Sequence, residues 1–187
     1  MKNLLVIILA LLSISCNAQI VSLESFAQCS AISNCPNFNY IKDINNALNK
    51  YIGTWKGNYN GKTYELQFKK VIYEDFGIKS DILKGRMRIK DPNGNTIYDT
   101  FSEPDDTKTK FSGFGFQPNI KYYMMHFVGN SPFACGEMGY VYLGIKPETP
   151  NIMTIKMIQD ADIVWGECPS SYQPTIPYTE FVSLTRQ

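Results

Sequence analysis

The sequence predicts an all-β protein: an antiparallel up-and-down β-barrel of about eight or nine strands with one short N-terminal helix. Three observations lead to this fold class. Apolar and polar residues alternate through much of the chain, turn signals such as DPNGN and KPETPN separate the alternating runs, and the runs follow one another at short, regular intervals. A sheet of so many strands has to close or double over to hide its edges, and short connections favour a closed barrel. A two-sheet sandwich is the competing architecture.

The chain opens with a pattern typical of an export signal. Lys2 precedes an apolar run from Leu4 to Leu12, and small residues follow. This run is too short to cross a bilayer, so residues 1–18 are expected to be a signal peptide. In the alternative, Cys16 is lipidated as in bacterial lipoproteins and only residues 1–15 are removed. Both routes predict export from a Gram-negative cytoplasm, either to the periplasm or medium or to a membrane anchor.

The charge balance argues against charged macromolecules as partners. The chain has 18 basic and 17 acidic side chains, and Lys2 would leave with the leader, so the exported protein is close to neutral. A neutral protein gains little electrostatic attraction to nucleic acid or to an anionic membrane. We therefore expect no nucleic-acid partner and contact with a membrane only through a lipid at Cys16. The sequence indicates no particular protein partner.

The remaining cysteines are consistent with export. Cys29, Cys35, Cys135 and Cys168 form an even set, which in an oxidising compartment is expected to be disulfide-bonded. Three pairings are open. The simplest joins the first two cysteines in a local loop and the last two between distant connections. Free buried thiols are the alternative.

Residues 19–39 show no regular pattern and are expected to form an N-terminal arm, followed by a single barrel domain over residues 40–187. The short helix is expected at the start of this domain, in YIKDINNALNKYIG, because apolar residues recur there at near-helical spacing and a glycine ends the run. These apolar residues are Ile41, Ile44, Leu48 and Ile52.

The strands are expected to follow this helix. TYELQF and LKGRMRIK alternate residue by residue between apolar and polar side chains. Further strands are expected near residues 95–102, 107–116, 120–128, 138–145, 151–159 and 178–185.

The stretch GTWKG lies where the helix should lead into the first barrel strand. A helical turn leading into Gly-x-Trp resembles the calycin superfamily, which contains the lipocalins, fatty-acid-binding proteins and avidins. The resemblance implies that Gly53 and Trp55 mark the closed end of the barrel and that Arg186 of the last strand packs over the indole. The helical lid of fatty-acid-binding proteins, the C-terminal helix of lipocalins and the biotin-binding residues of avidins have no counterpart, so no particular ligand is implied.

The chain is still more similar to an uncharacterised family of small exported proteins from flavobacteria. The stretches that carry this resemblance are GTWKG and DILKGRMRIKDPNGN (81–95). That family has no assigned activity. The resemblance therefore implies the fold and the export of the protein, and leaves its function open.

No catalytic motif is recognisable. The one histidine, His126, lacks a nucleophile context, and a single histidine excludes a His-cluster zinc site. Carboxylates cluster at Asp105 and Asp106 and at Asp160 and Asp162, and two converging acids can hydrolyse glycosides. Acidic turns are usually just solvated. We expect no enzyme activity, no metal and no cofactor, and a hydrolase stays as the last alternative.

Aromatic and methionine residues favour a binding protein. Several strands are apolar on both faces, and glycines between the aromatic residues leave room for a flat or elongated apolar guest. The leading hypothesis is non-enzymatic binding of a small apolar or amphipathic ligand inside the barrel. The alternative is a structural or interaction protein of the cell envelope with a filled core. The candidate lining residues are Phe111, Phe114, Phe116, Tyr123, Met125, Tyr140, Tyr142 and Met153.

Overall fold

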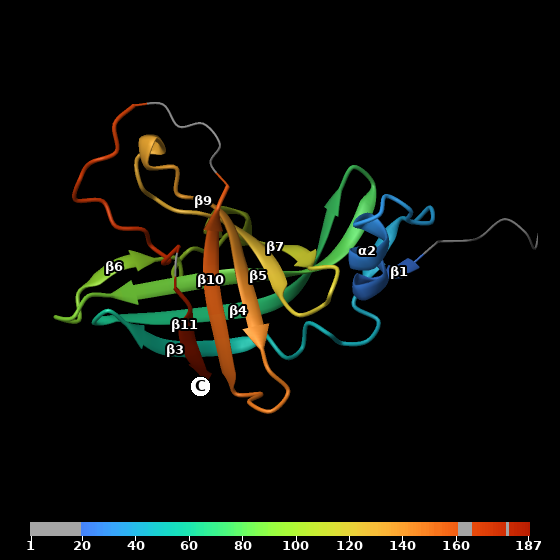
Figure 1. Cartoon of the computed structure of the whole chain (residues 1–187), viewed down its shortest axis with the longest axis horizontal. Helices are drawn as coiled ribbons and strands as arrows, with labels where there is room; N and C mark the ends of the chain where they lie inside the picture. Colours follow the sequence, from blue (N-terminus) through green and yellow to red (C-terminus); the bar gives the residue numbers. More distant parts are fainter. Residues whose placement is uncertain (1–19, 161–165, 179) are drawn as a thin grey trace, which may run out of the picture.

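The computed structural model describes residues 20–160, 166–178 and 180–187 (Figure 1). The predicted leader, its lipidation candidate Cys16 and the acidic residue Asp162 lie outside the described residues. The predicted fold class is confirmed, because the described residues form β-strands, most of them paired antiparallel, and one α-helix. The elements are β1 (Ile20–Ser22), α2 (Leu23–Ser30), β2 (Tyr40–Lys42), β3 (Gly53–Tyr59), β4 (Lys62–Asp75), β5 (Ile78–Lys90), β6 (Thr96–Asp99), β7 (Phe111–Phe116), β8 (Tyr123–Val128), β9 (Met138–Ile145), β10 (Ile152–Gln159) and β11 (Val182–Arg186), with 3-10 turns at Asp106–Thr109 and Phe133–Cys135.

A closed barrel of 8 antiparallel strands forms the body of the protein. Going around the ring, β5, β4, β3, β11, β10, β9, β8 and β7 are neighbours, and β7 returns to β5. The last junction is narrow, since Lys84 with Ser112 is the registered pair between β5 and β7. There β7 runs close to the β5 backbone: a Cβ on Gly113 would lie 2.8 Å from the Leu83 nitrogen. The barrel, not the sandwich, is therefore the architecture.

The hairpin of β4 and β5 is longer than the barrel needs. The two strands have 14 and 13 residues, and they stay paired from Thr63 and Lys90 out to Asp75 and Ile78. Their outer half leaves the barrel wall and projects beside α2 (Figure 1). There β5 pairs in parallel with β2, which in turn pairs with β1. The N-terminal arm thus extends the sheet at the projecting end of this hairpin.

The barrel interior is filled by large side chains. The apolar side chains that alternate along β4 and β5 are buried, as shown by Leu66 at 0% and Met87 at 1% exposure. Aromatic rings pack edge to face across the centre, with ring centroids of Phe111 lying 5.7 Å from Phe68 and 5.4 Å from Phe127. This packing follows the filled-core alternative for a barrel of this size.

The helix lies earlier in the chain than the sequence pattern predicts. Residues 40–52, where it was expected, form β2 and a series of turns, and this prediction was wrong. The Asp43 carboxylate accepts a hydrogen bond from the Leu48 backbone N–H, and Asn46 has a positive φ of 56°. Both favour turns over a continuous helix. The supposedly irregular arm holds α2 instead, capped by the Ser22 hydroxyl on the Ser25 N–H.

Both disulfides of the simplest pairing are present. Cys29 is bonded to Cys35 at the end of α2, and Cys135 is bonded to Cys168 between two long connections. Disulfides form and persist in oxidising surroundings, which indicates an environment outside the cytoplasm. Within the described ranges, we find no helix that is both long and apolar enough to span a membrane.

Candidate functional site

Trp55 lies at one end of the barrel and is fully buried. Its indole N–H donates to the Tyr51 carbonyl at 2.8 Å, and the Arg186 guanidinium lies over the ring at 4.3 Å from its centroid. The same guanidinium donates to the Ile52 carbonyl at 2.7 Å and to the Lys50 carbonyl. The stacked contact expected from the sequence is therefore present, and it ties the last strand to the turn before β3.

Of the eight residues expected to line the barrel, five point inward. These are Phe111, Phe116, Tyr123, Met125 and Met153, all of them nearly or fully buried.

The other three point outward, and that part of the prediction was wrong. Phe114 is 60% exposed, and its ring packs against Tyr140 on the outer face. Tyr140 and Tyr142 stand opposite His126 and Met124 in the β8–β9 register, which places them on the outside. A register shift between Gly113 and Gly115 lets residues 111 and 116 both face inward although they are an odd number of positions apart.

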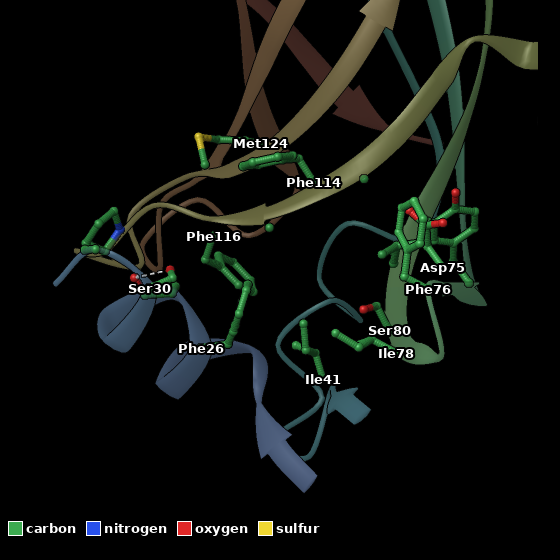
Figure 2. Close-up of a pocket in the computed structure, with 17 residues that line it drawn as sticks. Phe26, Ser30, Ile41, Asp75, Phe76, Ile78, Ser80, Phe114, Phe116 and Met124 are labelled. Carbon is green, nitrogen blue, oxygen red and sulfur yellow. Dashed lines mark hydrogen bonds between the residues drawn. The ribbon is translucent and has the colours of Figure 1, made fainter. Parts of the chain in front are cut away.

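An apolar cleft lies outside the barrel, where β5 leaves β7. Its volume is about 570 Å³, within the range of small-molecule sites in proteins. Figure 2 shows an open space with α2 on one side, the β4–β5 hairpin on the other and β7 above. The lining residues are Phe26, Ala27, Ser30, Ala31, Ile41, Tyr73, Asp75, Phe76, Ile78, Ser80, Ile82, Gly113, Phe114, Gly115, Phe116, Pro118 and Met124.

The cleft is apolar apart from a few groups. Among the described residues that line it, Asp75 is the only charged one, and Ser30, Ser80 and Tyr73 carry hydroxyls. Lys84 is not a wall residue; its ammonium lies over the ring of Tyr73 at 5.7 Å, and burial lowers its pKa. The wall therefore offers hydrogen-bond acceptors and a negative charge, but no cation.

A buried polar network fixes the position of this wall. Asp81 accepts a hydrogen bond from the Tyr40 hydroxyl at 2.7 Å and from the Asp43 backbone N–H at 2.9 Å. Lys70 forms an ion pair with Asp43 at 3.1 Å. The bond to Asp81 raises the pKa of Tyr40 to about 12. These contacts hold β2 and the following turn against the β4–β5 hairpin.

The tip of the hairpin is unusually apolar for an exposed turn. Phe76 is 98% exposed and has a φ of 48°, and Gly77 follows with a φ of 77°. Two consecutive positive φ values are typical of a type I′ turn, where asparagine or glycine is preferred at the first position. Ile72 and Tyr73 on the same hairpin are 65% and 45% exposed. The hairpin thus carries apolar side chains that its own packing does not require.

The acidic residues proposed for a hydrolase have structural partners. Asp105 caps a 3-10 turn by accepting from the Thr107 N–H at 2.9 Å, and Asp106 pairs with Lys69 and with Arg86. The bonds from Thr107 and from Lys69 lower the pKa values of Asp105 and Asp106, respectively, so both carboxyls stay ionised and neither is suited to donate a proton.

The remaining residues considered for catalysis or metal binding do not form a site with one another in the described structure. Asp160 is exposed, and its partner in the sequence-based proposal lies outside the described residues. His126 packs its ring against Tyr140 at 5.7 Å on the outer face. In the part of the chain that the structure describes, no three histidine, cysteine or acidic residues converge as a metal site would need.

The chain matches one known protein family over most of its length. A family described as "Family of unknown function (DUF6705)" matches residues 1–140. The chain belongs to this family. This match confirms the expectation that the chain belongs to a family without an assigned activity. No curated protein and no solved structure matches the chain. The closed barrel and the contact between Arg186 and Trp55 are compatible with a calycin-like fold.

Sequence reasoning missed most of the cleft. Of the predicted ligand residues, Phe114 and Phe116 line it; the walls from α2 and the hairpin were not anticipated. One signal for the hairpin was available: the stretch IYEDFGIK places apolar side chains directly beside a turn glycine. The position of α2 against the hairpin had no comparable signal, because it depends on the parallel pairing of two three-residue strands.

Proposed function

We propose that this member of the family is a non-enzymatic binding protein whose site is the cleft between α2, the β4–β5 hairpin and β7. The ligand is a small apolar or amphipathic molecule, as expected from the sequence, but it binds outside the barrel. The observation that carries this proposal is the apolar cleft of about 570 Å³ with exposed aromatic walls at Phe114 and Phe76. Burying such a surface under a ligand is favourable at roughly 25 cal/mol per Å².

The chemistry of the wall narrows the ligand class. An anionic head group would meet Asp75 without a compensating cation among the described lining residues. A neutral or cationic head group can accept or donate hydrogen bonds at the Ser30 and Ser80 hydroxyls, or pair with the carboxylate. We therefore propose a ligand with an apolar body and a neutral or cationic head, such as a long-chain alcohol or amine, in preference to a free fatty acid.

The test uses the neutral fluorescent probe N-phenyl-1-naphthylamine. We expect saturable binding to the full chain, and displacement by dodecanol and dodecylamine but much weaker displacement by dodecanoate. Ala31→Trp places a large ring in the cleft from the exposed end of α2, and it is expected to weaken probe binding about tenfold or more.

The matched control is Gln28→Trp, which adds the same ring to an exposed position of α2 that does not line the cleft. This variant should bind the probe like the unmodified protein. Equal binding by the Ala31→Trp and Gln28→Trp variants would overturn the proposed site. Preferential displacement by dodecanoate would overturn the proposed ligand class.

A further inference from the structure

Exposed apolar side chains gather at one end of the molecule. Phe76 at the hairpin tip is 98% exposed, Ile32 after α2 is 71% exposed, and Ile72 is 65% exposed. Ile20 in β1 adds a fourth at 48%. Figure 1 places α2, β1 and the projecting hairpin together at one end, with β6 at the other. Three of these four residues do not line the cleft, so the cleft does not explain them.

We propose that this end of the molecule docks on the surface of a lipid bilayer, with Phe76 and Ile32 entering the interface between headgroups and acyl chains. This inference goes beyond ligand binding in the cleft and does not depend on it. It departs from the expectation that the protein meets a membrane only through a lipid at Cys16.

The shape of this surface favours a bilayer over a protein partner. The two most exposed side chains stand on separate protrusions, the hairpin tip and the loop after α2, rather than on one flat patch. Apolar side chains on protrusions can each enter a soft interface, whereas a protein partner has to match the hollow between them. Three charged side chains lie beside the tip. Glu74 and Lys79 have opposite signs and face each other in the register, and Asp75 adds a negative charge next to Phe76. A zwitterionic headgroup layer has no net charge to repel Asp75.

The described chain begins at the same end of the molecule. Ile20 begins β1 at this end, and Cys16 precedes it by four positions. Four residues reach at most about 14 Å. Were Cys16 to carry a lipid, its acyl chains would therefore enter the bilayer beside Phe76 and Ile32. The apolar end and the anchor point would then act on one membrane.

The backbone at the tip supports a role for the side chain of Phe76. A bulky residue in the left-handed region is disfavoured, and Asn-Gly is a preferred pair for this turn. Phe76→Asn is therefore expected to fold at least as well as the natural sequence. This gives a variant that removes the apolar side chain without weakening the hairpin.

The test measures flotation with vesicles of phosphatidylethanolamine and phosphatidylglycerol and with vesicles of phosphatidylcholine. The full chain carries Cys16→Ala, so no acyl group contributes, and its N-terminus is read by mass spectrometry. We expect the protein to float with both kinds of vesicle. Phe76→Asn should lower the partition coefficient about tenfold, Ile32→Ser should lower it several-fold, and Ile97→Ser on β6, 53% exposed, should leave it unchanged.

Insertion and cleft binding can be separated. The emission of a Phe76→Trp variant should shift to the blue with vesicles and be quenched by brominated lipids, relative to the natural protein, whose two tryptophans, Trp55 and Trp165, supply the background. Ile32→Ser should keep the affinity for N-phenyl-1-naphthylamine, since Ile32 does not line the cleft. Protein that stays unbound with both kinds of vesicle, or equal partitioning of the Phe76→Asn and Ile97→Ser variants, would overturn the docking proposal and leave the cleft proposal standing.

Discussion

Removing the guanidinium of Arg186 tests how the closed end of the barrel is stabilised. Arg186→Ala deletes the stacking on Trp55 and two hydrogen bonds, to the Ile52 and Lys50 carbonyls. A cation over an indole contributes about 0.5–2 kcal/mol. A hydrogen bond to a charged group contributes about 1.5–3 kcal/mol, and less where water reaches it, as it does at this half-buried side chain. We expect a loss of about 3 kcal/mol in the free energy of unfolding.

The assay is urea unfolding with both disulfides intact, followed by tryptophan fluorescence. A loss of this size corresponds to a fall of about 6–12 °C in Tm for a domain of this length. Arg186→Lys keeps the charge but not the forked geometry, so it should lose about half as much. The control is Lys156→Ala, whose ammonium lies over Phe181 at 5.4 Å on the outer surface and should contribute at most about 1 kcal/mol. An Arg186→Ala variant whose free energy of unfolding lies within about 0.5 kcal/mol of that of the natural protein would show that these contacts do not stabilise the closed end.

Two further predictions concern the disulfides and the tyrosines. Replacing Cys135 and Cys168 by serine opens a loop with a sequence separation of 33, and the chain-entropy relation gives a loss of about 3–4 kcal/mol in the free energy of unfolding. Replacing Cys29 and Cys35, whose separation is 6, should cost about 2 kcal/mol. Urea unfolding of the two double variants shows which of them loses more stability. Tyr40 has a pKa raised to about 12 by its bond to Asp81, from 10.0, so its contribution to stability is complete below pH 10 and disappears as the pH rises through 12. Absorbance at 295 nm should show Tyr40→Phe removing a late-titrating group, and a variant that titrates like the natural protein would contradict the hydrogen bond.

The barrel could be predicted from the sequence because its interior positions alternate with few interruptions. Leu83, Gly85, Met87 and Ile89 occupy every second position of β5, and the three side chains are buried. The contact of Arg186 with Trp55 was expected from the resemblance to the calycin superfamily, and the two residues pair in the register of β3 and β11. In these elements the local pattern and the final packing agree.

The helix and the cleft could not be predicted in the same way. The apolar spacing of residues 40–52 is helical, but Asp43 bonds to the backbone of the turn and to Lys70, and these contacts hold the segment in turns. The outward direction of Phe114 depends on a register shift that the glycines permit but do not require. The cleft is formed by elements far apart in the chain, and no local sequence pattern indicates that these elements lie close together in the fold.

The narrow junction between β5 and β7 also bears on the order in which the barrel opens and closes. Strands β4 and β5, and strands β8, β9 and β10, pair with close neighbours in the chain, whereas the ring closes through two pairings between more distant segments, β3 with β11 and β5 with β7. Of these two, the β5–β7 junction is the narrower, with Lys84 and Ser112 as its registered pair. Contacts between near neighbours form first during folding, so ring closure is a late step. In the native protein, local unfolding should begin at this junction, and the amide hydrogens of β7 should exchange with solvent before those of β9 and β10. Because the cleft lies where these two strands separate, a ligand bound there would slow that exchange.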